Sequence, residues 1–139
     1  MLLVIALIAV AGVLAAAVLG GGIEGMRLRS AGKQIADELR QVRTHAIASG
    51  APQRFEIDPM AHRWNTSLGH SGKIPASLRV QFTGAREVQA SPGRGVIQFF
   101  PDGASSGGRI ELFAKQARWR VDVAWITGEV RGGRIGDAR

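Results

Sequence analysis

Residues 2–19 read LLVIALIAVAGVLAAAVL, and the interpretation of the whole chain starts from this run. Eleven of its 18 residues are Leu, Ile or Val, and none is charged. Each such residue favours insertion into a bilayer by roughly 0.3 to 0.6 kcal/mol, and 18 helical residues span about 27 Å, close to the hydrocarbon thickness. We therefore predict a transmembrane helix over residues 1–23. Its apolar side chains are Leu2, Leu3, Val4, Ile5, Leu7, Ile8, Val10, Val13, Leu14, Val18 and Leu19.

Two other interpretations of this run remain open. It could be a buried core helix, although helices that are apolar on all sides are rare in small domains. It could also be a cleaved signal peptide with a cleavage site at residues 15–17, which are all alanine. No Lys or Arg precedes the run, whereas five cations come after it between Arg27 and Arg43. For a membrane helix, the positive-inside rule would then place the adjoining domain in the cytoplasm.

Three glycines, residues 20–22, separate the apolar run from a second helical pattern. Three helical glycines cost about 3 kcal/mol relative to alanine, which is compatible with a helix end, a kink or a melted stretch. Beyond them, apolar residues recur at spacings that keep one helical face. We predict an amphipathic helical segment over residues 24–50, in which Ser49 and Gly50 stop the helix. Its predicted packing stripe is Leu28, Ile35, Leu39, Val42 and Ala46, with Ile47 beside it.

The remaining residues, 51–139, predict an antiparallel β domain. Alternating or short apolar runs are separated by Gly, Pro and Ser clusters, which is typical of a meander. The fold class is therefore α+β, with one long helix packed on an antiparallel β-sheet. The domain ends in a predicted flexible basic tail that starts at Arg131. The expected strands are residues 54–58, 63–65, 78–82, 96–100, 109–113, 118–125 and 129–131.

The composition excludes several kinds of chemistry. The chain has no Cys, so it has no disulfide, no thiolate zinc site and no Cys nucleophile. Its three histidines, at positions 45, 62 and 70, are far apart and are expected to be solvated, and its 11 carboxylates are scattered. We therefore expect no enzyme, no cofactor and no metal site. The 18 Lys and Arg give a net charge of +7, and a basic surface of this kind can engage phosphates.

Several motifs together resemble a known family. They are the segment 28–50 with VRTHAIASG at its end, the string IQFFPDG at 97–103 with SSGG at 105–108, and WRVDV at 119–123 with GEV at 128–130. In this order and spacing, and behind an apolar helix, they resemble the minor pseudopilin H family of type II secretion, a branch of the type IV pilin-like proteins. The motifs cover most of the chain.

The resemblance implies a pilin-like fold and a structural role without a cofactor. Family members wait in the inner membrane as single-pass proteins with the globular domain in the periplasm. They then assemble into a short pseudopilus that helps to move folded proteins through the outer-membrane channel. In that filament the apolar helices form the core. The implied partners are the major pseudopilin, the tip subunits I, J and K, the inner membrane, and the prepilin peptidase if a leader lies upstream.

One part of the family pattern has no counterpart in this sequence. Family precursors carry a short basic leader, a glycine at the peptidase site and a Phe-Thr-Leu-x-Glu-like start. Residues 1–10 resemble the apolar stretch that comes directly after that start, so we expect that the sequence begins at an internal Met. The cations of a leader would resolve the conflict over orientation. The cleavage site and the N-methylated residue of the family have no position to be assigned to here.

A second function stays open at this point. A related minor pilin could bind DNA for uptake through a basic surface, for which the arginines of the tail are the candidates. Such contacts would be non-specific and sensitive to salt. The candidate residues are Arg131, Arg134 and Arg139.

Overall fold

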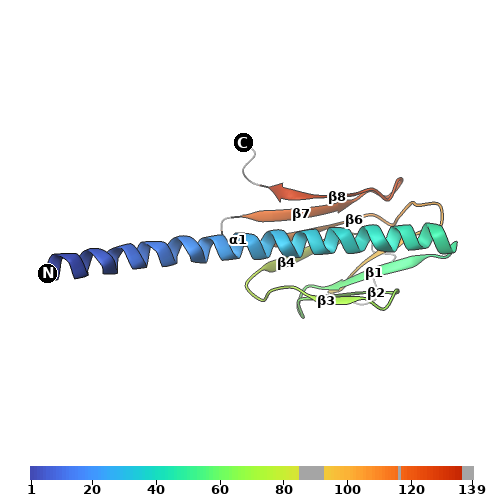
Figure 1. Cartoon of the computed structure of the whole chain (residues 1–139). Coiled ribbons are helices and arrows are strands. Elements are labelled where there is room, and N and C mark those ends of the chain that lie inside the picture. The colour runs from blue at the N-terminus through green and yellow to red at the C-terminus, as the bar shows by residue number, and fades with distance from the viewer. Residues whose placement is uncertain (85–92, 116, 136–139) are drawn as a thin grey trace.

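The computed structural model describes residues 1–84, 93–115 and 117–135, with the side chains of residues 15–22 left aside. One α-helix, α1 (Leu2–Ser49), precedes the β-strands (Figure 1). The helix ends at Gly50, which has a left-handed backbone (φ 69°) and donates its N–H to the carbonyl of Ala46. The strands are β1 (Gln53–Asp58), β2 (Arg63–Thr66), β3 (Ser71–Lys73), β4 (Arg79–Gly84), β5 (Gly95–Phe99), β6 (Gly108–Phe113), β7 (Arg118–Val123) and β8 (Val130–Ile135).

The helix is continuous through the glycines at 20–22. From the sequence, a helix end, a kink or a melted stretch were all possible there. The strands form two four-stranded antiparallel sheets, in the orders β3-β2-β1-β5 and β4-β6-β7-β8. The α+β fold with a long N-terminal helix on antiparallel sheet is therefore confirmed, but the expected single meander is two sheets. The division arises because β4 pairs with β6 along its whole length rather than with its neighbours in sequence.

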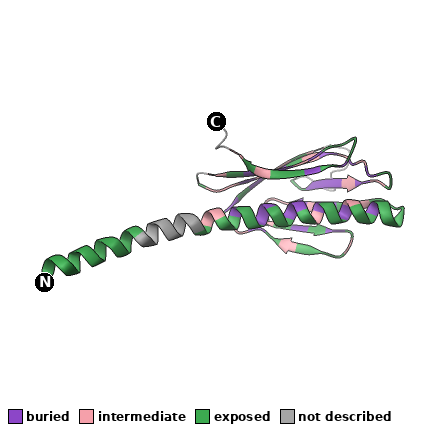
Figure 2. Ribbon diagram, turned by 45° about the horizontal axis from the view of Figure 1, so that its top comes forward, coloured by how far each residue is buried: buried purple, intermediate pink, exposed green. Residues whose placement is uncertain are grey.

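The core lies where the second part of α1 crosses both sheets (Figure 2). The helix contacts β7 and β8 of one sheet and β1 and β5 of the other. Leu28, Ile35, Leu39, Val42 and Ala46 are buried against the strands, whereas Ile47 is 46% exposed. The strand side of the core is built from residues that alternate along each strand, chiefly Phe55, Ile57, Ile97, Phe99, Ile110, Leu112, Trp119 and Val121.

Two close approaches depend on glycine. A Cβ at Gly32 would lie 2.2 Å from Cδ1 of Trp119, so the indole ring of β7 lies directly on the helix backbone. A Cβ at Gly72 would lie 2.3 Å from the ring of Trp64, which covers β3 in the same way. The strand β3 was not predicted because Ser71, Gly72 and Lys73 carry no apolar alternation. Instead, β3 is held in place by its pairing with β2 and by the Trp64 ring that covers it.

The predicted flexible tail is wrong for residues 131–135. They form most of β8, which pairs with β7 from Val123↔Val130 to Arg118↔Ile135. The two glycines that suggested flexibility lie inside the strand, where Gly132 brings the backbone close to the helix: a Cβ there would lie 3.5 Å from that of Ala36. Residues 136–139, including Arg139, lie outside the described residues.

Candidate assembly surfaces

The first surface is the N-terminal part of α1, which projects beyond the strands (Figures 1 and 2). We call residues 2–14 the arm. Every residue of the arm is exposed, and Leu7 keeps 73% of its surface accessible. The last two apolar residues predicted for the run, Val18 and Leu19, have side chains outside the described set.

Within the parts of the chain that the structure describes, no helix combines the length and the apolar character that a bilayer crossing requires.

An exposed helix as apolar as the arm is expected to be buried in lipid or against another protein surface. Single exposed apolar side chains are normal on proteins, but contiguous apolar surface of several hundred Å² marks an interaction site. The arm presents Leu, Ile and Val on all sides of one helix, so no orientation against the domain could hide it. Beyond its first turn, its backbone groups are hydrogen-bonded within the helix, as an apolar environment demands. The arm can therefore be buried in lipid or against other helices without rearrangement.

Two arginines fasten the packed part of α1 to the second sheet. Arg43 donates from Nε to the carbonyl of Gly103 at 3.1 Å and from a terminal nitrogen to that of Thr127 at 3.0 Å. Arg40 donates to the carbonyl of Val130 at 3.1 Å. The accepting carbonyls belong to the β5–β6 and β7–β8 connections and the start of β8, so these contacts set the axial position of the helix relative to the strand ends.

Arg43→Ala is expected to lower the free energy of unfolding by about 1–3 kcal/mol, because two carbonyls lose a charged donor. The measurement is thermal unfolding of the full chain in detergent, followed by circular dichroism. Arg54→Ala is the matched control, since the side chain of Arg54 is exposed and makes no hydrogen bond or ion pair with the described residues, so the melting temperature should stay unchanged. A melting temperature for Arg43→Ala equal to that of the unsubstituted chain would contradict the role of this residue.

The second surface lies at the end of the domain farthest from the arm. The strand predicted to run to Trp125 ends at Val123, and the chain turns so that Trp125 and Ile126 are 68% and 65% exposed. Ile47 is exposed near the end of α1, which reaches the same end of the domain (Figure 1). We call Ile47, Trp125 and Ile126 the distal patch. The distal patch was not predicted from the sequence, because the alternation of apolar residues does not show where a strand ends.

Charges on the outer face of the second sheet are largely paired. Arg109 donates from Nε to Asp122 at 2.6 Å across the β6–β7 ladder, and Arg120 lies 3.5 Å from Glu111. The hydrogen bond to Asp122 raises the pKa of Arg109 above its ordinary value, so this guanidinium stays charged wherever the protein is folded. These pairs bridge neighbouring strands and add modestly to sheet stability.

The histidines do not come together. His62 hydrogen-bonds through Nε2 to the carbonyl of Leu78 at 2.8 Å, and His70 pairs through Nδ1 with Glu38. Both have partners in the protein. His70 is exposed, as the sequence predicted, whereas His62 is half-buried. Among the residues that the structure describes, no three His, Cys, Asp or Glu side chains are grouped as metal ligands would be.

Arg131 and Arg134, two of the three arginines proposed for DNA binding, have different surroundings. Arg131 is paired with Glu129 at 3.2 Å, and Arg134 lies beside Trp119 in a hollow that also includes residues of α1. Arg139 falls outside the described part of the chain.

A bare apolar arm that continues into a helix packed on antiparallel sheet defines a pilin-like subunit. The minor pseudopilin EpsH from the type II secretion system of Vibrio cholerae has this fold, with a TM-score of 0.64 and 14% identity over 81% of this chain and 99% of the EpsH chain. The type IV minor pilin FimU of Pseudomonas aeruginosa matches with a TM-score of 0.59 and 10% identity over 78% and 89%. At these identities the likeness concerns the fold alone.

The chain belongs to the GspH family of type II transport proteins, which matches residues 31–128. It is 69% identical over 135 residues to the type II secretion system protein H of Xanthomonas campestris pv. campestris, and the match covers 97% of this chain and 80% of that protein. The predicted family and the predicted function, a minor pseudopilin of type II secretion, are confirmed. Membership implies a protein of the cell envelope that associates with other pseudopilins. The DNA-uptake alternative is not favoured.

Proposed function

We propose that the arm anchors this subunit in the inner membrane before assembly and enters the helical core of the pseudopilus afterwards. The observation that carries the proposal is that every residue of the arm is exposed, whereas the same helix is buried against the sheets further along. The same apolar side chains suit both environments, because lipid tails and neighbouring apolar helices are alike to them. The domain would then stand in the periplasm as a structural part and not as a catalyst. The segments 1–23, 24–50 and 51–139 serve as membrane or filament helix, packing helix and globular domain.

We assign the apolar residues from Leu2 to Leu19 to membrane and filament contacts and the buried stripe from Leu28 to Ala46 to internal packing. The support for this division is the change from exposed to buried along one helix. The filament partners that we propose for the arm are the major pseudopilin and the tip subunits I, J and K. A prepilin peptidase acts on the chain if a leader precedes it.

We propose that the distal patch contacts the next subunit towards the tip. Trp125 and Ile126 are exposed in the connection between β7 and β8, and Ile47 is exposed near the end of α1. This connection and the end of α1 both lie at the end of the domain opposite the arm (Figure 1). In a filament whose helices are parallel, this end faces the subunit above. Exposed Trp side chains are enriched among the residues that dominate interface energies, which favours the patch as a protein contact.

Cysteine crosslinking in cells tests this function. Single cysteines at Leu3, Leu7 and Ile126 are expected to crosslink to co-expressed pseudopilins, and the absence of native Cys removes background. The control is Asn65→Cys, an exposed position on β2 that belongs to neither surface. Crosslinks from Leu3 and Leu7 to the major or tip pseudopilins support the filament-core role. A membrane-bound protein that forms none of them contradicts it.

A further inference from the structure

Cations gather at the end of the domain from which the arm emerges. The register of the second sheet lines up Arg79, Phe113 and Arg118 on neighbouring strands. The guanidinium carbons of Arg79 and Arg118 lie 4.8 and 5.9 Å from the centre of the Phe113 ring. Lys115 comes next in the β6–β7 connection. Together with Ser77 they line a hollow, which we call the basic hollow.

The basic hollow has no counter-charge among the described residues. Arg79, Lys115 and Arg118 are exposed and form no ion pair or side-chain hydrogen bond with any of them. This differs from the middle of the same sheet, where Arg109 and Arg120 are paired with carboxylates. The two arginines of the hollow instead share one aromatic ring, which keeps two like charges close together at an exposed site. A site of this kind attracts an anion with several acceptor oxygens.

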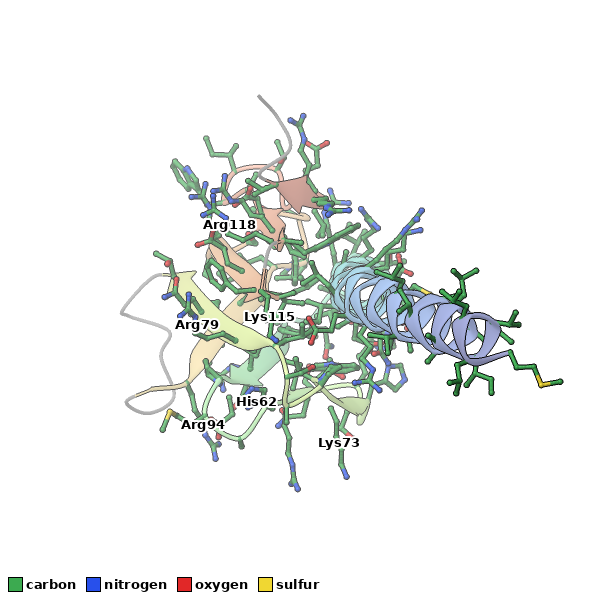
Figure 3. All side chains as sticks on the ribbon, turned by 90° about the vertical axis from the view of Figure 1, so that its left-hand side faces the viewer. His62, Lys73, Arg79, Arg94, Lys115 and Arg118 are labelled. Carbon is green, nitrogen blue, oxygen red and sulfur yellow. The ribbon has the colours of Figure 1, made fainter. Side chains whose placement is uncertain are left out.

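The other sheet adds charge to the same end. Lys73 lies opposite Arg63 in the β2–β3 ladder, and both are exposed. Arg94 is there too, 3.5 Å from Asp58. Figure 3 looks along the helix from its N-terminal side, and the labelled His62, Lys73, Arg79, Arg94, Lys115 and Arg118 are spread over the strands to one side of the helix. The basic end therefore faces the direction in which the arm leaves the domain.

The geometry points to anionic phospholipid headgroups as the ligand of the basic hollow, and we propose that the domain docks on the membrane surface through it before assembly. This proposal rests on the proposed anchoring of the arm. Leu28, the first buried residue of α1, lies nine residues after Leu19, or about 14 Å of helix. The headgroup layer occupies roughly 5–8 Å of this length, so the near end of the packed domain, where the basic hollow lies, starts within about one Debye length of it. Guanidinium and ammonium groups at that distance are attracted to an anionic leaflet.

Docking on the membrane would fix the orientation of the domain before assembly. A subunit held against the leaflet by its basic end has its helix axis and its distal patch presented in a defined direction. Leaving the membrane for the filament then requires these contacts to break. Since such contacts are screened by salt and depend on lipid charge, we expect docking to respond to both.

The experiment uses the full chain reconstituted into vesicles of phosphatidylcholine alone or with about one-third phosphatidylglycerol. Ser77→Cys places a polarity-sensitive fluorophore beside the basic hollow. We expect a blue-shifted emission and a roughly two-fold higher intensity in the anionic vesicles, with the difference lost at high salt. Lys115→Gln is expected to reduce this response, and the double variant Arg79→Gln, Arg118→Gln to abolish it. The cations stacked on the Phe113 ring are Arg79 and Arg118, so Lys115→Gln removes a charge without removing either of these cation–π contacts.

The matched control is the double variant Arg54→Gln, Arg131→Gln, which removes the same charge near the opposite end of the domain and should keep the response. Equal emission in both kinds of vesicle, with the chain floating with both, would overturn the proposal and leave the anchoring intact. Loss of the response on adding glycerol phosphate, but not chloride of the same ionic strength, would assign the hollow to a soluble phosphate instead. A chain that floats with neither kind of vesicle would contradict the anchoring itself and with it this proposal.

Discussion

Gly32→Ala is expected to lower the free energy of unfolding of the domain by about 2–3 kcal/mol, although alanine is the better helix former. The added Cβ would lie 2.2–2.5 Å from three atoms of the Trp119 ring, so either the indole or the helix must move. Trp119 is only 9% exposed and packs within the core of the domain. The ring therefore has little freedom to give way. Thermal unfolding of the full chain in detergent should show a fall on the order of 10 °C.

Gly25→Ala is the matched control for this substitution. It lies seven residues earlier on the same helix, and no atom lies within 4 Å of the position of its Cβ. The same chemical change should there stabilise the helix by about 0.5–1 kcal/mol. A Gly32→Ala protein as stable as the unsubstituted chain, with unchanged Trp fluorescence, would show that Trp119 does not lie on the helix backbone.

Leu7→Asp is expected to remove the protein from the membrane fraction and to abolish secretion. An aspartate near the centre of a bilayer costs about 2.5–3.5 kcal/mol on insertion scales, and in a filament core it would face apolar helices. The melting temperature of the domain should stay unchanged, because Leu7 is 73% exposed and lies outside the core. Ile8→Asp should behave in the same way. The measurements are membrane fractionation and the amount of exported protein in the medium.

Leu7→Phe is the control, since it changes the shape of the side chain and keeps it apolar. It should retain membrane association. Unchanged fractionation and secretion of the Leu7→Asp variant would contradict both the proposed anchoring and the proposed filament contact of the arm.

Local patterns in the sequence predict the elements that are repeated and apolar. The stripe from Leu28 to Ala46 has helical spacing, and alternating residues such as Phe55 and Ile57 mark the strands, so both could be found without a structure. The division into two sheets could not be predicted, because it depends on which distant strands pair. β4 pairs with β6 and not with β3 or β5, its neighbours in sequence. Most of β8 was missed because its two glycines carry no apolar alternation and suggest a flexible tail, although these residues pair with β7.

Of the three surfaces, the arm was predicted from the sequence, whereas the distal patch and the basic hollow were not. The arm is continuous in sequence and therefore visible there. The distal patch depends on where β7 ends, and Trp125 continues an inward-facing alternation that the turn then breaks. The basic hollow depends on register, because Arg79 and Arg118 are 39 residues apart and meet only through their common neighbour Phe113 on β6. Composition showed that the chain is basic, but not that cations without carboxylate partners gather at one end of the described domain.

The single helix has a consequence for how force passes through the subunit. A pull along α1 reaches the domain through a helix that crosses both sheets, and through Arg40 and Arg43, which hold the strand connections at its far end. All these contacts are then loaded together, in shear, and none can be peeled away first. A sideways pull on one outer strand would separate its pairings one after another. The subunit is thus better suited to bear a load along α1 than a load across its sheets.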